Sequence, residues 1–261
     1  MRPASPPEGR IALAAGPPLP DKPSIAVLLP AAGHSRRRTQ FARQQLADRR
    51  NQRDGRIQAR LPLHHNGPAQ RQWRSTGPVP ADKGWDAFAD DQLGLMDHLG
   101  IREFFYMGYC IGGCFAGKLL QRAPDRIVAA VLHQSVGHRP EDPDIMMRHS
   151  RDNWLPDFRA RRPEVPMDTI EKYFHSLWRA QPDFLYSVSR EFINNCRTPI
   201  LVLPDDTPSH PLQTSIDVAS LAPNAEITVF PWREPEELRQ RIINKVRNFL
   251  KAHIPMRAAA Q

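Results

Sequence analysis

The chain has 261 residues, of which 40% are hydrophobic, and its 36 Lys and Arg against 28 Asp and Glu give a formal net charge of +8. This length suits one large α/β domain or two small ones. No apolar run approaches the roughly 18 residues that a membrane span needs, which excludes an integral membrane protein. Three cysteines are too few for a disulfide framework, and the proline-flanked start is a poor secretory signal. We therefore expect a cytoplasmic protein.

The positive charge is concentrated in one segment. Residues 34–75 contain 11 Arg and 2 Asp, with no Lys and no Glu, which accounts for the whole excess of +8. A nucleic-acid-binding surface would combine such charge with aromatic residues or a recognition helix. This segment is instead rich in glutamine, and its only aromatic residues are Phe41 and Trp73. We interpret it as a solvated or disordered arm, with nucleic-acid binding as the less favoured alternative.

The same region has an unusual composition. No Glu occurs between Gly9 and Arg102, and no Lys between Lys22 and Lys83. Arg, Gln, Pro, Ala and His are the residues that a GC-rich coding sequence gives when it is read out of frame. We therefore hypothesise that residues 36–73 are a displaced or remodelled segment. We expect few buried apolar contacts there, because its few apolar side chains cannot offset about 1–2 kcal/mol of backbone entropy per ordered residue.

From residue 77 onward, the sequence alternates between two kinds of apolar pattern. Helical spacing predicts helices over 84–99 (with Asp82 as N-cap), 111–122, 211–221 and 234–252. Short apolar runs predict four buried neighbouring strands: Phe104–Met107, Val128–Leu132, Leu201–Leu203 and Ile227–Phe230. Residues 140–195 lack strand signals and are predicted to be a mostly helical insertion. The alternation predicts an α/β protein, with a mostly parallel sheet and helices on both faces.

One motif joins a predicted strand to a predicted helix. Residues 108–113 read Gly-Tyr-Cys-Ile-Gly-Gly, which matches the nucleophile-elbow pattern in its expected strand–turn–helix context. Glycines two positions either side of Cys110 avoid clashes in a strained turn, and a helix N-terminus favours a thiolate and a developing oxyanion. We predict that Cys110 is a nucleophile, the alternative being a small buried residue. Cys114 and Cys196 fit no metal pattern and are predicted to be core thiols, and we expect no metal or cofactor.

The hexapeptide resembles the elbow of dienelactone hydrolases, which use cysteine where most α/β-hydrolase relatives use serine. Residues 90–101, 122–127 and 199–206 resemble the esterase, haloperoxidase-like and C–C-bond hydrolase group of the same fold. The resemblance implies an α/β-hydrolase fold with a helical cap over the active site. We therefore divide the chain into a proline-rich tail (1–22), a first strand with an oxyanion loop (23–35), an atypical Arg/Gln-rich segment (36–76), a core (77–139 and 196–252), a cap (140–195) and a second tail (253–261).

The resemblance also implies where the remaining site residues belong. The triad runs nucleophile, acid, histidine along the chain. Asp206 matches the position of the acid better than Asp205 does, although both aspartates also suit a turn. The oxyanion hole is expected to use the backbone N–H groups of Ile111 and of Ala31 or Ala32.

The catalytic histidine is absent from its implied place after the last strand, where residues 229–234 read Val-Phe-Pro-Trp-Arg-Glu. His210, four residues after the predicted acid, is the favoured replacement. His133 and His138, which follow a buried strand, are the alternatives. We expect Trp232 or Arg233 to occupy the position that the catalytic histidine has in the family. An arginine there could pair with the predicted acid.

Two functions remain open. The first is a cysteine-dependent hydrolase that acts on a small ester, lactone or other activated carbonyl compound. The second is a non-catalytic relative that keeps the pocket as a binding or interaction module, which the missing histidine favours. In both cases the expected partner is a small molecule, with no membrane, and nucleic-acid binding is the less favoured alternative.

Overall fold

The computed structural model describes residues 10–12, 26–30, 64–66 and 78–255. Its main sheet has six strands in the order β3-β2-β5-β6-β7-β8, and β1 pairs with β4 in a separate two-stranded sheet. The strands are β1 (Arg10–Ala12), β2 (Ala26–Pro30), β3 (His64–Asn66), β4 (Pro78–Pro80), β5 (Phe104–Tyr109), β6 (Ile127–His133), β7 (Ile200–Leu203) and β8 (Ala225–Ile227).

The four strands predicted from residue 77 onward form one parallel array. β5 pairs with β6, β6 with β7 and β7 with β8, all in parallel. This confirms the predicted α/β class with a mostly parallel sheet. The last strand is a correction, because it spans 225–227 rather than 227–230. It lies at the sheet edge, where Val229 and Phe230 just beyond it are 56% and 41% exposed.

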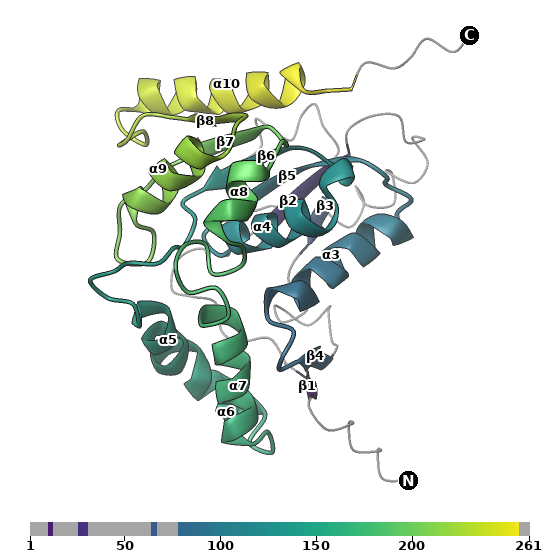
Figure 1. Cartoon of the computed structure of the whole chain (residues 1–261), viewed down its shortest axis with the longest axis vertical. Coiled ribbons are helices and arrows are strands. Elements are labelled where there is room, and N and C mark those ends of the chain that lie inside the picture. Colours follow the sequence, from purple (N-terminus) through teal and green to yellow (C-terminus); the bar gives the residue numbers. More distant parts are fainter. Residues whose placement is uncertain (1–9, 13–25, 31–63, 67–77, 256–261) are drawn as a thin grey trace.

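Helices connect these strands, and a helical segment follows β6 (Figure 1). The connecting helices agree with the predictions to within one or two residues, except that Gly84 rather than Asp82 is the N-cap of α3. None of the helices in the described ranges is long and apolar enough to cross a membrane. The helical elements are α3 (Trp85–His98), α4 (Gly112–Arg122), η1 (Pro124–Arg126), α5 (Ile145–His149), the π-helix η2 (Ser150–Trp154), α6 (Leu155–Arg161), α7 (Met167–Trp178), α8 (Arg190–Asn195), α9 (Leu212–Leu221) and α10 (Glu236–Ala252).

The parallel strands bury side chains on both faces, as period-2 alternation requires. On one face, Phe104 and Tyr106 of β5 join a core with α3, α4 and the helices between β6 and β7. On the other face, Phe105 of β5 and Val131 of β6 pack with residues of α10 such as Val246. Figure 1 shows α10 along the top of the molecule, apart from α3 and α4. The sheet is therefore covered on both sides.

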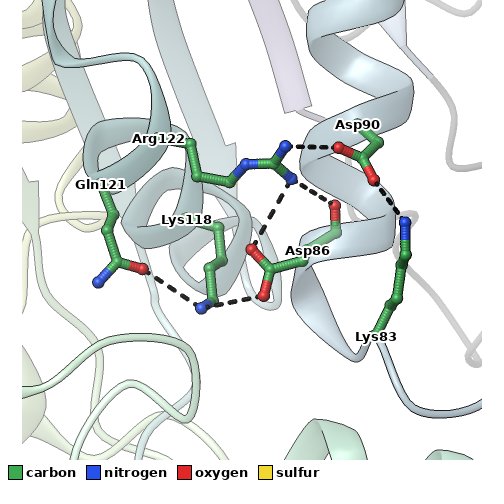
Figure 2. Close-up of polar contacts among 6 residues, drawn as sticks. All are labelled: Lys83, Asp86, Asp90, Lys118, Gln121 and Arg122. Carbon is green, nitrogen blue, oxygen red and sulfur yellow. Dashed lines mark hydrogen bonds and ion pairs between the residues drawn. The ribbon is translucent and has the colours of Figure 1, made fainter.

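Charged side chains fasten α3 to α4, the helix that begins beside Cys110 (Figure 2). Arg122 Nη2 lies 2.6 Å from Asp90 Oδ1, and Arg122 Nη1 donates to the backbone carbonyl of Asp86 at 3.1 Å. Lys118 Nζ lies 3.2 Å from the Asp86 carboxylate, and Lys83 Nζ lies 3.5 Å from Asp90. This α3–α4 cluster joins α4 to α3 through partly exposed charged side chains.

The N-terminal predictions fall largely outside the described residues, including most of the 36–73 segment. Within that segment, β3 pairs antiparallel with β2. β2 in turn pairs antiparallel with β5, with Pro30 opposite Phe104 and Ala26 opposite Gly108. The C-terminal end of β2 therefore lies beside the N-terminal end of β5, at the opposite end of that strand from Cys110, and the predicted oxyanion residues after β2 lie outside the described residues.

Candidate active site

Cys110 stands in a tight turn between β5 and α4. Its φ is 58°, in the left-handed region that non-glycine residues rarely adopt. Backbone hydrogen bonds hold this turn. The N–H of Cys110 donates to the His133 carbonyl at 3.1 Å, and the Cys110 carbonyl accepts from the N–H groups of Gly113 at 3.1 Å and Val136 at 3.2 Å. Strain of this kind costs about 1–3 kcal/mol and concentrates at functional sites. The predicted sharp turn is confirmed.

The glycines of the motif have different steric roles. A Cβ at Gly108 would stand 2.5 Å from the carbonyl oxygen of Gly112, and a Cβ at Gly113 would stand 2.3 Å from the Ser135 hydroxyl. A Cβ at Gly112 would meet nothing closer than the Tyr106 hydroxyl at 3.6 Å. The neighbouring atoms therefore leave no room for a side chain at positions 108 and 113, whereas position 112 has more space.

The structure brings His210 to Cys110, although the two residues are 100 positions apart in the chain. His210 Nε2 lies 3.2 Å from Cys110 Sγ, within the reach of a sulfur hydrogen bond. The Tyr109 ring stands beside both, with its centroid 6.3 Å from that of His210. This is the contact expected of a general base and a nucleophile.

A four-residue turn, Thr207–His210, places that imidazole. His210 N–H donates to the Thr207 carbonyl at 3.0 Å, and Thr207 N–H donates to the His210 carbonyl at 3.2 Å. Pro208 stands at the second position of the turn, where proline is favoured. The same turn sets Thr207 Oγ1 2.7 Å from His210 Nδ1. Sequence reasoning missed Thr207, yet the Thr-Pro-Ser-His turn signal could have found it.

Asp206, the predicted acid, is not brought to His210. Its Oδ1 lies 3.5 Å from Arg139 Nη2 and 3.5 Å from the backbone N–H of Leu212, and its side chain is 51% exposed. Arg139 also donates to the carbonyls of Thr207 and Pro208. The physical reason is the tight turn, which begins one residue after Asp206 and presents Thr207 to the imidazole instead.

The neighbouring carboxylate, Asp205, is buried and paired. Arg233 Nη2 lies 3.3 Å from Asp205 Oδ2 and 3.4 Å from His133 Nε2. The prediction that Arg233 would pair with Asp206 is therefore wrong, because Arg233 pairs with Asp205 instead. Trp232 is buried, donates Nε1–H to the Pro204 carbonyl at 2.9 Å, and packs edge-on against the His133 ring. Trp232 and Arg233 thus stand beside His133 and Asp205, next to the site.

Burial governs the ionisation of the groups around the sulfur. Desolvation lowers the pKa of His210, nearby Asp205 raises it, and Arg233 and His149 lower it further. Burial raises the pKa of Tyr109, and so does the neighbouring Cys110. The net result is a lowered pKa for His210, which favours the neutral imidazole that a general base needs.

The other two thiols differ from Cys110. Cys114 donates to the Leu185 carbonyl at 2.9 Å, and burial raises its pKa well above the usual range. Burial also raises the pKa of Cys196. Both are buried and free, which confirms the prediction of core thiols. Across the described ranges, no group of three or more His, Cys, Asp or Glu side chains could hold a metal ion.

The remaining predicted residues are placed as follows. Ile111 immediately precedes α4 and is its N-cap, so its backbone N–H belongs to the positive end of that helix. His138 donates its backbone N–H to the carbonyl of Phe184, which lies between α7 and α8. The His133 ring packs edge-on against Tyr109. Ala31 and Ala32 lie outside the described residues.

Comparisons with known proteins agree on the fold. A family model for the α/β-hydrolase fold matches residues 73–172, and no curated protein matches the chain. The enol-lactonase from Burkholderia xenovorans LB400 is 19% identical, with a TM-score of 0.51 over 73% of this chain and 81% of that chain. MGS-M2, an α/β hydrolase enzyme from a Medee basin deep-sea metagenome library, is 16% identical, with a TM-score of 0.51 over 77% and 82%. The chain therefore has the α/β-hydrolase fold.

Proposed function

We propose that the protein is a cysteine-dependent hydrolase that acts on a small ester, lactone or other activated carbonyl compound. Cys110 is the nucleophile and His210 is the general base. The observation that carries this proposal is the 3.2 Å separation between His210 Nε2 and Cys110 Sγ at a strained elbow. Nucleophile and base within hydrogen-bond reach, at the N-terminus of a helix, are the parts that acyl transfer needs. The likeness to an enol-lactonase structure agrees with such a substrate class.

The first half of the reaction forms a thioester. His210 Nε2 takes the thiol proton of Cys110, and the sulfur attacks the carbonyl carbon, so that the carbonyl electron pair moves onto oxygen. The backbone N–H of Ile111, at the positive end of α4, stabilises that oxyanion. The pair then returns, the bond from carbon to the leaving oxygen breaks, and the imidazolium gives its proton to that oxygen.

The second half restores the enzyme. A water molecule attacks the thioester carbon while His210 takes the proton of that water. When the tetrahedral intermediate collapses, the carbon–sulfur bond breaks and the acid product leaves. The imidazolium returns its proton to the Cys110 sulfur, so the cycle is balanced without any added oxidant or cofactor.

Burial limits access to the sulfur. Cys110 is 8% exposed, and His210 is partly buried beside the ring of Tyr109. We therefore propose a low molecular weight ester or lactone, rather than a bulky one, as the substrate.

Hydrolysis of a panel of small activated esters and lactones by the purified protein tests the proposal. We expect Cys110→Ala and His210→Ala to abolish turnover. Cys196→Ala is the matched control, because it removes a buried thiol that is the C-cap of α8 and has no part in the proposed chemistry, and it should leave the rate unchanged. Equal non-zero rates for wild type and His210→Ala would eliminate His210 as the base.

A non-catalytic binding module is the second candidate. The neutral hydroxyl of Thr207, rather than a carboxylate, stands beside His210 Nδ1, and the buried Asp205 is paired with Arg233. Under this alternative, small lactones raise the melting temperature of the protein without being consumed. Measured turnover that depends on Cys110 excludes it.

A further inference from the structure

The imidazole of His210 has two ring nitrogens with different partners. Nε2 faces Cys110 Sγ at 3.2 Å, and Nδ1 faces Thr207 Oγ1 at 2.7 Å. In a nucleophile–base–acid triad, the partner of the second nitrogen fixes the tautomer and orients the ring. Here that partner is a hydroxyl group, while the two neighbouring aspartates are engaged by arginines.

We propose that Thr207 is the positioning residue that takes the place of the triad carboxylate, its hydroxyl oxygen accepting a hydrogen bond from Nδ1–H of His210. This inference rests on the proposed function and names the third member of the same site. Accepting from Nδ1–H leaves the lone pair on Nε2 toward the Cys110 thiol, which is the tautomer that a base requires.

The backbone makes this contact well defined. Thr207 and His210 exchange two backbone hydrogen bonds, so neither residue can move without the other. Threonine is β-branched and has few χ1 rotamers, which limits the entropy lost in fixing its hydroxyl. Arg139 adds hydrogen bonds to the carbonyls of Thr207 and Pro208 and so holds the turn from the segment after β6.

A hydroxyl differs from a carboxylate in one chemical respect. It orients the ring and accepts a hydrogen bond, but it supplies no negative charge to stabilise the imidazolium. Thr207 therefore sets geometry and tautomer while leaving the base weak. This predicts a slower enzyme than one with a carboxylate in the same position.

Three substitutions separate the hydroxyl from shape and charge. Thr207→Val removes the hydroxyl but keeps the branched shape, Thr207→Ser keeps the hydroxyl, and Thr207→Asp adds a carboxylate. If Thr207→Val does not fold, Thr207→Ala serves as the second hydroxyl-free variant. Two readouts need no turnover: the ring-nitrogen NMR shifts of His210, which report its tautomer, and the pH dependence of Cys110 alkylation by iodoacetamide.

In Thr207→Val, we expect His210 to lose its preference for the tautomer with the proton on Nδ1. Iodoacetamide should also alkylate Cys110 about tenfold more slowly at neutral pH, which is the upper end of what one hydrogen bond contributes. Thr207→Ser should restore both readouts, and Thr207→Asp should accelerate alkylation. A wild-type tautomer and alkylation profile in Thr207→Val would overturn the assignment, as would a Thr207→Ser variant that matches Thr207→Val. Hydroxyl-dependent readouts without any hydrolysis would retain Thr207 and reject the proposed function, so the two failures are distinguishable.

Discussion

Arg233 holds the carboxylate of Asp205, with Nη2 3.3 Å from Oδ2, and Asp205 is buried, with 8% of its surface exposed. The two charges act in opposite directions on His210, because Asp205 raises its pKa and Arg233 lowers it. This ion pair therefore makes two opposing contributions to the pKa of His210, whose ring stands beside Cys110.

Replacing Arg233 by methionine should raise the pKa of His210. The substitution removes a nearby positive charge and releases Asp205, and both changes favour the imidazolium. Because the general base must be neutral, the acid limb of the pH–rate profile should move to higher pH. NMR titration of the His210 ring measures the shift directly. Arg239→Met, whose ion pair is with Glu236 within α10, is the control. An unchanged or lower His210 pKa in Arg233→Met would contradict the electrostatic account.

The stability of the protein should fall as the pH drops through the range in which free histidine titrates. Burial lowers the pKa of both His210 and His149 in the folded protein. Below the ordinary value of about 6.5, the unfolded chain binds protons that the folded chain does not, so protonation favours unfolding. Denaturant unfolding at several values between about pH 7 and pH 5.5 measures the slope. His210→Gln should flatten it, and an equal slope in that variant would remove His210 from the explanation.

Gly108→Ala should disrupt the elbow. The added Cβ would stand 2.5 Å from the Gly112 carbonyl oxygen, a backbone atom that cannot move away cheaply. The expected cost is about 1–3 kcal/mol in the free energy of unfolding. Gly94→Ala is the matched control, since a Cβ there meets nothing within 4 Å and alanine favours a helix interior by about 0.5–1 kcal/mol. Thermal or denaturant unfolding of both variants checks the pair, and equal effects would argue against a steric requirement at Gly108.

The α3–α4 cluster should contribute a small, salt-sensitive part of the stability. Arg122 contacts Asp90 and both the backbone and side chain of Asp86, whereas Lys83 contacts Asp90 alone and is more exposed. Arg122→Ala should therefore cost about 1 kcal/mol and Lys83→Ala less, and added salt should narrow the difference. Urea unfolding at low and high salt measures both. A larger cost for Lys83→Ala would contradict this ranking.

The fold was readable from sequence where local pattern and long-range packing agree. β5, β6 and β7 are uninterrupted apolar runs buried on both faces, so their composition alone marks them. The sequence places the last strand too far along the chain. β8 is an edge strand of only three residues, and the apolar Val229 and Phe230, which the prediction includes, lie beyond it and are exposed. Hydrophobicity does not distinguish an edge residue from a core residue.

The site was only partly readable from sequence. Cys110 was marked by glycine spacing, which reflects a local steric demand. His210 was a weaker inference from position in the chain, and the partner of its Nδ1 was assigned to Asp206. Which side chain meets that nitrogen depends on the geometry of the Thr207–His210 turn and on the competing arginines, Arg139 and Arg233. The turn is local and is signalled by Thr-Pro-Ser-His, but the two arginine contacts are tertiary, and no local pattern encodes them.

The measurement that tests the central claim most directly is the trapping of an acyl-enzyme. The protein is mixed with p-nitrophenyl acetate, quenched in acid and mapped by peptide mass spectrometry. We predict a burst of nitrophenolate and a single acetyl group, which fragment ions of the peptide that carries both Cys110 and Cys114 place on Cys110. This label should be absent in Cys110→Ala and strongly reduced in His210→Gln. An acetyl group spread equally over Cys110, Cys114 and Cys196, or no acetyl group on Cys110 at all, would contradict the assignment of Cys110 and His210 as nucleophile and base.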